Sequence, residues 1–440
     1  MNRKVLILLL ILFVISTAFF IFQHSRDLGW DFSVYVLNAK YLFSGGFYFE
    51  WLRAPLVPLI IGILSFVAFG SYLVAEYLYI ALVSFLFFFA SVTLAKKLRI
   101  NLLIFYGLLL SPFLLLVGLT AGTELLYLTF LMFAINFTLS DKKNSAIFLG
   151  IFVGLAFLTH YTSLVFMFLF FVRRPWLKRT FTSLVSFIII ISPWFLYNFL
   201  ATGSLLTSIA DSYAQNIYFR DYLFMPFSLS HFLQAFSYYY LAFFIPGIFI
   251  CFKNLKNKKI DYFPLLLMSI FFLLVLYFYS RIPLKNPRYL FLLTLPITFF
   301  STSFFEKLEK KLNRRAIIII LVTIILANFL FSIFVLFSYI SPFSNRLEYK
   351  NVLMNIEKDC MYSSDKWVYL NYFGIVAEPM PWNKEELLQA LGKGKRFVIF
   401  GSAEPEYLND RPFLETLPTI KKLLITQLLV MKVCALNLTK

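Results

Sequence analysis

Charged residues are scarce in this chain of 440 residues, at 14%, whereas hydrophobic residues make up 60%. A soluble domain carries about 25% charged residues. A chain with so little charge cannot hide its apolar surface in a water-soluble core, so we expect lipid to be part of its solvent. Cysteine and histidine are also rare, with three of each, and neither C-x-x-C nor H-E-x-x-H occurs. A zinc site therefore has no sequence support, and no Gly-rich nucleotide loop is present.

The net charge of +18 does not indicate nucleic-acid binding, because the basic residues form short clusters between apolar runs. Such clusters are typical of membrane-topology determinants. Eleven apolar runs are predicted spans, and most of them approach the ~20 residues that cross a bilayer, although the fifth and sixth are short. These predicted spans are 5–22, 73–95, 101–118, 124–140, 145–159, 161–172, 180–200, 232–252, 262–280, 289–305 and 316–340.

With the N-terminus inside, twenty Lys and Arg residues fall in the inner loops and seven in the outer segments up to residue 341. This excess is what the positive-inside rule requires. We interpret the run 55–69 as an interfacial helix in a long outer loop, 23–72, because counting it as a span would reverse the charge balance. The first span could instead be a cleaved signal peptide, but no A-x-A site follows it.

The fold class predicted is an all-α polytopic membrane protein of about 11 transmembrane helices (1–341), followed by a small C-terminal extracytoplasmic α/β domain (342–440). In the latter, residues 346–358 and 383–391 are helix-like, and Asn383 with Glu386 has the form of a capping box. Cys360 and Cys434 could pair in an oxidising exterior or stay as buried thiols. Strand-like runs are Trp367–Leu370, Phe397–Phe400 and Leu424–Leu436.

Two polar groups follow the first span on the predicted outer side. Asp31 opens a helix-like stretch that runs to Ser44 and ends at Gly45-Gly46. Asp31 is either functional or merely the N-cap of that helix. Arg53, close to Glu50, is either a functional cation or a snorkelling anchor.

Further along the chain, Glu124 is a carboxylate between two apolar spans with no basic neighbour in sequence, which favours a function. Arg281, Lys285 and Arg288 place three cations on the outer side, against the positive-inside trend, and an anionic ligand such as a phosphate would explain them. His160, at a predicted outer turn, is as compatible with packing as with ligand binding.

Together these residues predict an outer cavity with two carboxylates and a basic cluster, at a face where the ligand can be a lipid. The chemistry that suits them is group transfer from a lipid phosphate: cations hold the phosphate leaving group, and a carboxylate accepts the proton of the attacking hydroxyl.

Over residues 1 to about 305 the chain resembles the GT-C glycosyltransferases, specifically the family-39-like group of protein O-mannosyltransferases and lipid A aminoarabinose transferases. The resemblance lies in the order and spacing of motifs that are individually weak. They are Asp31 with Tyr35 and Ala39, Arg53-Ala-Pro-Leu, Thr123-Glu124, Gly154-Leu-Ala-Phe-Leu-Thr-His160-Tyr161, Ser192-Pro193-Trp194 with Asn198 and Gly203, and Pro287-Arg288-Tyr289.

The resemblance implies inverting transfer of a sugar from a polyprenyl- or dolichyl-phosphate donor to a hydroxyl of a protein, lipid or glycan. The charge count predicts a multi-pass cell-membrane protein with a cytoplasmic N-terminus. Asp31 matches the proposed base, and Glu124 matches a residue that positions substrate or a metal. Arg53 and Arg288, with Lys285 and Arg281, are the candidates for donor phosphate. The candidates for substrate binding are Tyr35, His160 and Tyr289.

The sequence departs from the family at three places: Asp31 lacks a second adjacent acid, Ala54 replaces a proline, and His160 stands where a lysine is common. No cofactor is required by the residues, and a divalent metal ion at Asp31 and Glu124 stays an open alternative. A non-catalytic transporter or flippase of lipid-linked sugars is the alternative function. It would need polar residues deep in the spans and on both faces. A secondary transporter would show matching halves, which are not visible.

Overall fold

The computed structural model describes residues 3–173, 175–256, 262–339, 361–393, 396–399, 421–423 and 428–431. The chain divides into two compact units. The first comprises Met1–His24 and Glu50–Ser338, and the second comprises Ser25–Phe49 and Tyr339–Lys440.

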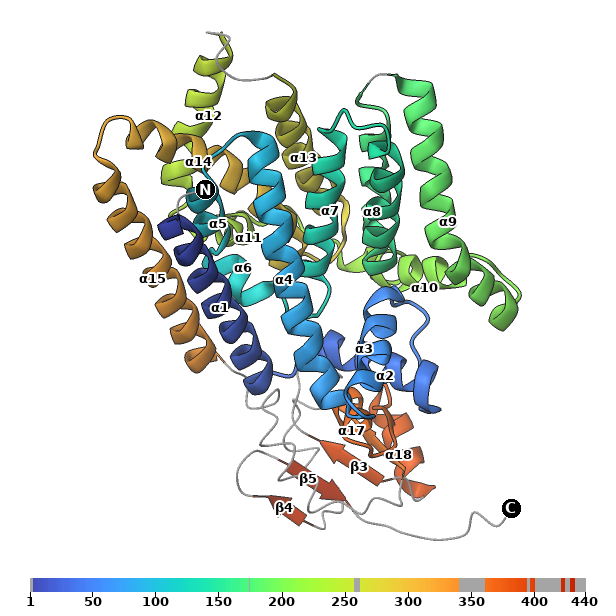
Figure 1. The fold of residues 1–440 in the computed structure, drawn as a ribbon. Helices are drawn as coiled ribbons and strands as arrows, with labels where there is room; N and C mark the ends of the chain where they lie inside the picture. Colours follow the sequence, from blue (N-terminus) through green and yellow to red (C-terminus); the bar gives the residue numbers. More distant parts are fainter. Residues whose placement is uncertain are drawn as a thin grey trace. The chain divides into compact units, whose positions relative to one another are not determined.

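The first unit is helical (Figure 1). Three of its segments, labelled η, are 3₁₀ helices. In chain order the elements are α1 (Arg3–Arg26, whose last two residues belong to the second unit), α3 (Leu56–Val67), α4 (Tyr72–Leu98), α5 (Leu102–Leu109), α6 (Pro112–Val117), α7 (Glu124–Thr138), α8 (Ser145–Thr159), η1 (Tyr161–Phe170), α9 (Trp176–Thr202), α10 (Thr207–Asn216), η2 (Tyr218–Leu223), α11 (Leu229–Ala235), α12 (Leu241–Lys256), α13 (Tyr262–Arg281), η3 (Pro287–Leu293), α14 (Thr294–Glu309) and α15 (Arg314–Tyr339).

Among the described residues, six helical segments are long and apolar enough to cross a membrane. They are Arg3–Arg26, Tyr72–Leu98, Trp176–Thr202, Tyr262–Arg281, Pro287–Glu309 and Arg315–Ser338. Each matches a predicted span. Several of the other predicted spans are shorter apolar helices of 10–17 residues, including α7, α8 and η1. The predicted all-helical membrane fold is confirmed, but not the number of eleven crossings.

The predicted continuous span 101–118 is wrong, because α5 and α6 are separate helices. Pro112 has no N–H to continue the hydrogen-bond pattern of α5. Instead it occupies the start of α6, where Ser111 is the N-cap and its Oγ accepts the N–H of Leu114 at 3.3 Å. Likewise, the predicted span 161–172 contains a 3₁₀ helix of ten residues, η1.

The run 55–69 contains α3, a helix of 12 residues. At 1.5 Å per residue it covers roughly 18 Å, which is too short for a ~30 Å hydrocarbon core. It packs against α4 and α8 and leaves Ile63, Phe66 and Val67 exposed. The helix is therefore too short for a full span, and its interfacial position stays a prediction.

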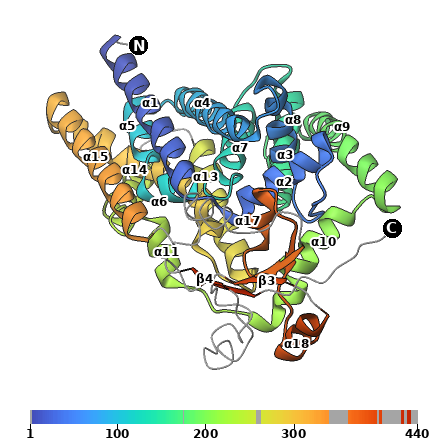
Figure 2. The same ribbon diagram turned by 90° about the horizontal axis from the view of Figure 1, so that it is seen from below.

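The helices differ in how far the protein encloses them. In the apolar window of Pro287–Glu309, 83% of residues are buried, against 28% in those of α1 and α9. α1 lies between α4 and α15 in both views (Figures 1 and 2), with Phe13 against Phe88 and Phe19 against Phe329. α14 therefore belongs to the core of this unit, whereas α1 and α9 present much of their surface to lipid.

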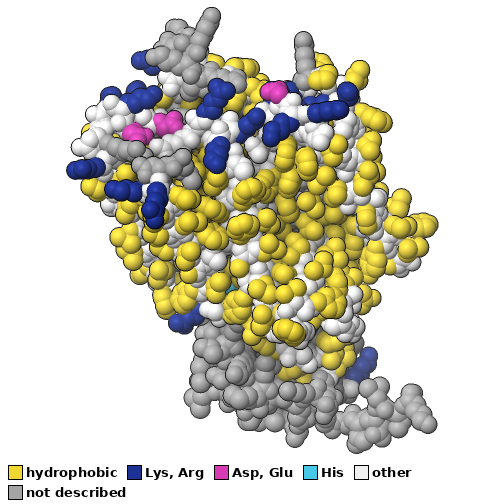
Figure 3. All heavy atoms as spheres, in the orientation of Figure 1, with side chains coloured by type: hydrophobic (Ala, Val, Ile, Leu, Met, Phe, Trp, Pro, Cys, Tyr) yellow, Lys and Arg dark blue, Asp and Glu magenta, His cyan; other side chains and the backbone are white. Residues whose placement is uncertain are grey.

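Basic side chains gather at one end of the helical unit, above a belt of hydrophobic side chains (Figure 3). It is the end at which α4 finishes and α9 begins (Figure 1). The loops that the positive-inside rule assigns to the inner side include Lys96–Arg99 after α4 and Lys178–Arg179 in α9. The shared end is the arrangement expected if these loops face the cytoplasm.

In the residues that the structure describes, the second unit combines α2 (Trp30–Ser44) with a mixed five-stranded sheet and two further helices. The sheet has the order β2-β1-β3-β5-β4, in which β1 is parallel to β2 and β3, and β5 is antiparallel to β3 and β4. These elements are β1 (Tyr362–Ser364), α17 (Trp367–Tyr372), β2 (Ala377–Pro379), α18 (Lys384–Gly392), β3 (Arg396–Ile399), β4 (Lys421–Leu423) and β5 (Leu428–Met431).

The predicted strand Trp367–Leu370 is wrong, because these residues form helix α17. The aromatic and β-branched run resembles a strand locally. In the structure the run is helical, and its Val368 packs with Val34 and Leu37 of α2 in one buried cluster. Tertiary packing against α2 therefore overrides the local preference.

The other predictions for this region divide into those the structure tests and those it does not. Asn383 caps α18, since its Oδ1 accepts the N–H of Glu386 at 2.8 Å, and the Glu386 carboxylate accepts the N–H of Trp382 at 3.1 Å. β3 confirms the strand predicted at Phe397–Phe400, and β5 lies within the predicted run Leu424–Leu436. The predicted helix 346–358, Cys360 and Cys434 lie outside the described residues.

Candidate functional site

Glu124 and Arg288 form an ion pair across 164 residues of sequence. Nε of Arg288 lies 3.5 Å from Oε1 of Glu124, and the Thr123 hydroxyl donates to Oε2 at 3.1 Å. The Glu124 side chain is 6% exposed and that of Arg288 is 30% exposed. A buried carboxylate is costly unless it is paired, and Arg288 is the partner of Glu124 there. The structure thus brings together one predicted carboxylate and one predicted cation.

Both members of the pair stand at the start of a helix. Glu124 is the first residue of α7, where the helix dipole favours a negative charge. Arg288 follows Pro287 at the start of η3, and the Asn286 side chain accepts the Arg288 N–H at 3.0 Å. Arg288 also lies over the Tyr289 ring, 5.9 Å from its centroid, which places predicted residue Tyr289 beside the pair.

The loop before Glu124 is fixed by two residues of neighbouring helices. Gln23 of α1 donates to the carbonyl of Leu116 at 2.8 Å and to the Thr120 hydroxyl at 3.2 Å. Tyr79 of α4 donates to the carbonyl of Gly122, whose φ of +87° suits glycine. These bonds hold the backbone that carries Glu124. The sequence analysis missed both residues.

Arg53 is paired with Glu50: its Nε donates to Oε2 at 2.9 Å, and both side chains are 16% exposed. This contact differs from the snorkelling alternative, in which the guanidinium would reach water. The backbone carbonyl of Arg53 accepts a hydrogen bond from the Tyr161 hydroxyl at 3.4 Å. The Tyr161 hydroxyl in turn accepts the indole N–H of Trp194 at 3.1 Å. Three motifs of the family resemblance therefore meet through hydrogen bonds.

The same chain of hydrogen bonds continues into α10. Trp194 donates to the Ser208 hydroxyl at 3.0 Å, and Asn198 donates to it at 2.8 Å. Gly203 ends α9 with a φ of +78°. The motif residues Trp194, Asn198 and Gly203 thus fix how the chain turns from α9 to α10.

His160 lies between α8 and η1, as predicted for a turn. Its ring is stacked on Tyr127, with centroids 5.4 Å apart and planes 11° apart, and its Nδ1 is 2.7 Å from the Thr162 hydroxyl. Tyr127 is one helical turn after Glu124 on α7. His160 is therefore packed on the same helix that carries the candidate carboxylate.

Lys285 and Arg281 differ from the other predicted cations. The Lys285 ammonium donates to the carbonyls of Ser280 (3.1 Å) and Ile282 and lies over the Phe224 ring. Burial lowers the pKa of Lys285. Arg281 is the exposed last residue of α13. The contacts of Lys285 are those of a group that caps the carbonyl end of α13.

Asp31 and Tyr35 belong to the second unit, one turn apart on α2. The alternative in which Asp31 is merely the N-cap of this helix does not hold, because the N-cap is Gly29 and Asp31 lies in the first turn. The helix does end at Gly45, whose φ is +69°. Trp30, beside Asp31, packs edge-on against Tyr369 with centroids 5.4 Å apart.

A second carboxylate, Asp27, accompanies Asp31 and was missed by the sequence analysis. The pKa of the Tyr369 hydroxyl is raised, first by burial and then by the negative charges of Asp27 and Asp31. Both carboxylates therefore lie close enough to Tyr369 to act on it. Their spacing of four residues is the sequence signal that could have identified the pair.

A further polar pair, His24 and Glu76, was also missed. Nε2 of His24 is 2.7 Å from Oε2 of Glu76, and the two side chains are 4% and 1% exposed. Glu76 falls within a predicted span, and a carboxylate in an apolar run is itself a signal for a polar partner. The pair links α1 to α4, three residues before Tyr79.

Among the described residues, no cluster of three or more His, Cys, Asp or Glu side chains could hold a metal ion. The Glu124 carboxylate is paired with the Arg288 guanidinium, and a divalent metal ion at Asp31 and Glu124 stays an open alternative.

Comparison with solved structures gives a match over nearly the whole chain. The crystal structure of ArnT from Cupriavidus metallidurans bound to undecaprenyl phosphate matches with a TM-score of 0.72 and 13% sequence identity, covering 98% of each chain. The same protein in the apo state matches with a TM-score of 0.68 and 13% identity, covering 97% of each chain. No family model and no curated protein sequence matches. At this identity the likeness establishes the fold.

Proposed function

We propose that this chain, which has the fold of the GT-C glycosyltransferases, transfers a sugar from a polyprenyl-phosphate donor to an acceptor hydroxyl at the outer membrane face. The observation that carries the proposal is the Glu124–Arg288 pair, which joins two motifs of the family resemblance in space. The ArnT structure with undecaprenyl phosphate supports a lipid phosphate as the donor's carrier.

Arg288 acts on the leaving group. When the bond between the sugar C1 and the phosphate oxygen breaks, its electron pair and negative charge move onto the phosphate. An arginine presents five N–H donors, more than one carboxylate oxygen can accept, so one guanidinium can bridge Glu124 and a phosphate. Glu124 then orients Arg288. Arg53, oriented by Glu50 in the same way, is the second candidate cation.

Asp31 acts as the general base. Its carboxylate accepts the proton of the acceptor hydroxyl while the acceptor oxygen forms the new bond to C1. Attack from the side opposite the phosphate inverts the anomeric centre, as in other single displacements at a sugar carbon. Base catalysis of this kind contributes about 10²–10⁴-fold in rate.

The side chains of Tyr35, His160 and Tyr289 are proposed to contact the sugar or acceptor. The proposed topology has a cytoplasmic N-terminus and an extracytoplasmic C-terminal domain, with the basic end of the helical unit inside (Figure 3). The acceptor is a hydroxyl of a protein, lipid or glycan.

The test is release of polyprenyl phosphate. The purified protein in nanodiscs is supplied with undecaprenyl-phosphate sugars that differ in the sugar, together with a crude membrane extract that contains lipids, glycans and proteins as acceptors. Time-dependent release from at least one donor, lost in Arg288→Gln, supports the proposal. Binding of donor without release from any of them would instead favour a non-catalytic carrier of lipid-linked sugars.

A further inference from the structure

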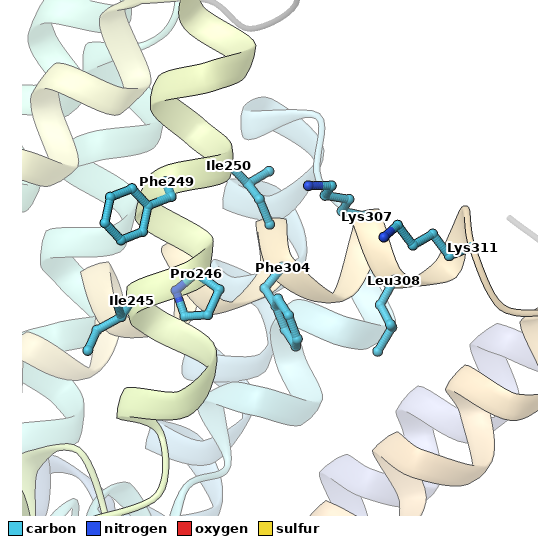
Figure 4. Close-up of a pocket in the computed structure, with 8 residues that line it drawn as sticks. All are labelled: Ile245, Pro246, Phe249, Ile250, Phe304, Lys307, Leu308 and Lys311. Carbon is cyan, nitrogen blue, oxygen red and sulfur yellow. The ribbon is translucent and has the colours of Figure 1, made fainter.

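A groove lies between α12 and α14, on elements that the proposed transfer does not use (Figure 4). Its volume is about 410 Å³. Six of its lining side chains are apolar and two are lysines, Lys307 and Lys311. The groove therefore combines a long apolar wall with two positive charges.

The shape of the groove follows from how the two helices meet. At Gly247 of α12, a Cβ atom would lie 2.0 Å from the carbonyl oxygen of Phe300, so only glycine allows this close approach. Next to it, the Cys251 thiol donates to the Ser303 hydroxyl at 3.1 Å. Beside this closed contact, Ile245 and Phe249 are 48% and 70% exposed and form a wall that is open toward lipid.

The acidic and basic side chains at the end of α14 have different surroundings. Glu306 accepts the backbone N–H of Asn101 at 2.6 Å, and Glu309 accepts the Asn101 side-chain amide at 3.2 Å. Lys307 and Lys311 instead extend along the groove toward α12 (Figure 4). Within the described part of the chain, neither lysine has an ion-pair or hydrogen-bond partner for its ammonium group. The groove therefore offers two ammonium groups beside an apolar wall, which suits a ligand that has a negative charge and an apolar part.

We propose that the groove binds an anionic glycerophospholipid, with its phosphate between Lys307 and Lys311 and an acyl chain along Ile245, Phe249 and Phe304. A free anion would leave the apolar wall uncovered, and a zwitterionic lipid brings its own cation to the lysines. Basic pockets between helices on the cytoplasmic side are suited to anionic head groups, and that leaflet is the one rich in them. The groove adjoins the basic segment 307–315, which the positive-inside rule assigns to this side.

The site differs from the donor-phosphate candidates in its helices and in its residues, and it does not depend on the proposed transfer. The experiment that tests it therefore measures lipid binding and not sugar transfer. The delipidated full chain in neutral detergent is titrated with phosphatidylglycerol or phosphatidylcholine, and bound lipids are counted by native mass spectrometry. A third titration uses inorganic phosphate as competitor.

The wild-type protein should retain phosphatidylglycerol in preference to phosphatidylcholine. The double variant Lys307→Gln, Lys311→Gln should weaken phosphatidylglycerol binding by about 25-fold, since each lysine near a lipid head group contributes roughly fivefold, or ~1 kcal/mol. Ile245→Trp, which fills the groove and keeps both lysines, should also weaken it. Lys310→Gln is the matched control, because Lys310 is next in sequence but does not line the groove.

Three results would overturn the proposal. The first is an unchanged lipid preference in the double variant. The second is an equal loss in Lys310→Gln, which would show a diffuse charge effect of this end of the molecule. The third is displacement of phosphatidylglycerol by millimolar inorganic phosphate, which would show a simple anion site. If the double variant fails to fold, phosphatidylglycerol binding by Ile245→Trp and the competition with inorganic phosphate decide between the outcomes.

Discussion

The ion pair between Glu124 and Arg288 predicts that the two residues act as one unit in transfer. At 3.5 Å, two unit charges attract by about 5 kcal/mol at an effective dielectric constant of 20 and by about 1 kcal/mol in water. Arg288 is 30% exposed and Glu124 6%, so the pair lies between these limits. We expect a coupling energy of about 2–3 kcal/mol, which corresponds to roughly 30- to 150-fold in rate.

A double-mutant cycle measures this coupling. The four proteins are the wild type, Glu124→Gln, Arg288→Gln and the double variant, and the quantity is kcat/KM for release of polyprenyl phosphate. Arg288→Gln alone should cost about 2–5 kcal/mol, because it removes the charge proposed to contact the donor phosphate and leaves Glu124 buried without that partner. Glu124→Gln should cost 2–3 kcal/mol in the wild type and much less once Arg288 is absent.

Arg220→Gln serves as the control, since this arginine of η2 is not among the candidate residues. All variants must first show unfolding temperatures near that of the wild type. Effects of the two substitutions that add within about 0.5 kcal/mol would refute the reasoning, because independent sites behave in that way. Wild-type turnover in Arg288→Gln would remove Arg288 from the site altogether.

Three further predictions concern other residues. Asp31→Asn should leave folding and donor binding intact while transfer falls by about 10²-fold or more; retained transfer in that variant would move the base to another carboxylate. Lys285→Met should lower stability by about 1–3 kcal/mol, because two partly buried carbonyls lose the ammonium group that donates to them. The Kd for the sugar donor should change less than twofold, whereas a lost affinity at unchanged stability would place Lys285 at the phosphate. In a cysteine-free background, an impermeant thiol reagent on intact cells should label Glu385→Cys and not Lys97→Cys, both exposed positions, and the opposite pattern would reverse the topology.

The helical membrane fold could be predicted from the sequence, and so could each of the two residues of the ion pair. Glu124 could be identified because a carboxylate between apolar runs needs a reason, and Arg288 because it opposed the charge asymmetry of the loops. That they pair with each other could not be read from the chain, since nothing local relates residues 164 positions apart. The glutamate's burial is a tertiary property.

The predictions that failed did so where tertiary packing or backbone chemistry decided the outcome. Trp367–Leu370 has the composition of a strand, and only its contact with Val34 and Leu37 of α2 explains a helix. The span 101–118 is apolar throughout, but Pro112 starts a new helix within it. The hydropathy of a segment predicts whether it prefers lipid, but it does not predict whether the segment forms one continuous helix.

The composition of the second unit has a consequence for how the protein is made. α2, which carries Asp31, packs on α17, yet more than 300 residues of the chain are synthesised between them. At 5–20 residues per second, the ribosome needs roughly 15 to 60 seconds to bring α17 out after α2 has emerged. During that time the apolar face of α2, with Val34 and Leu37, has no α17 to cover it. A chain that stops before residue 361 could insert its helices and would still lack the packing partner of α2.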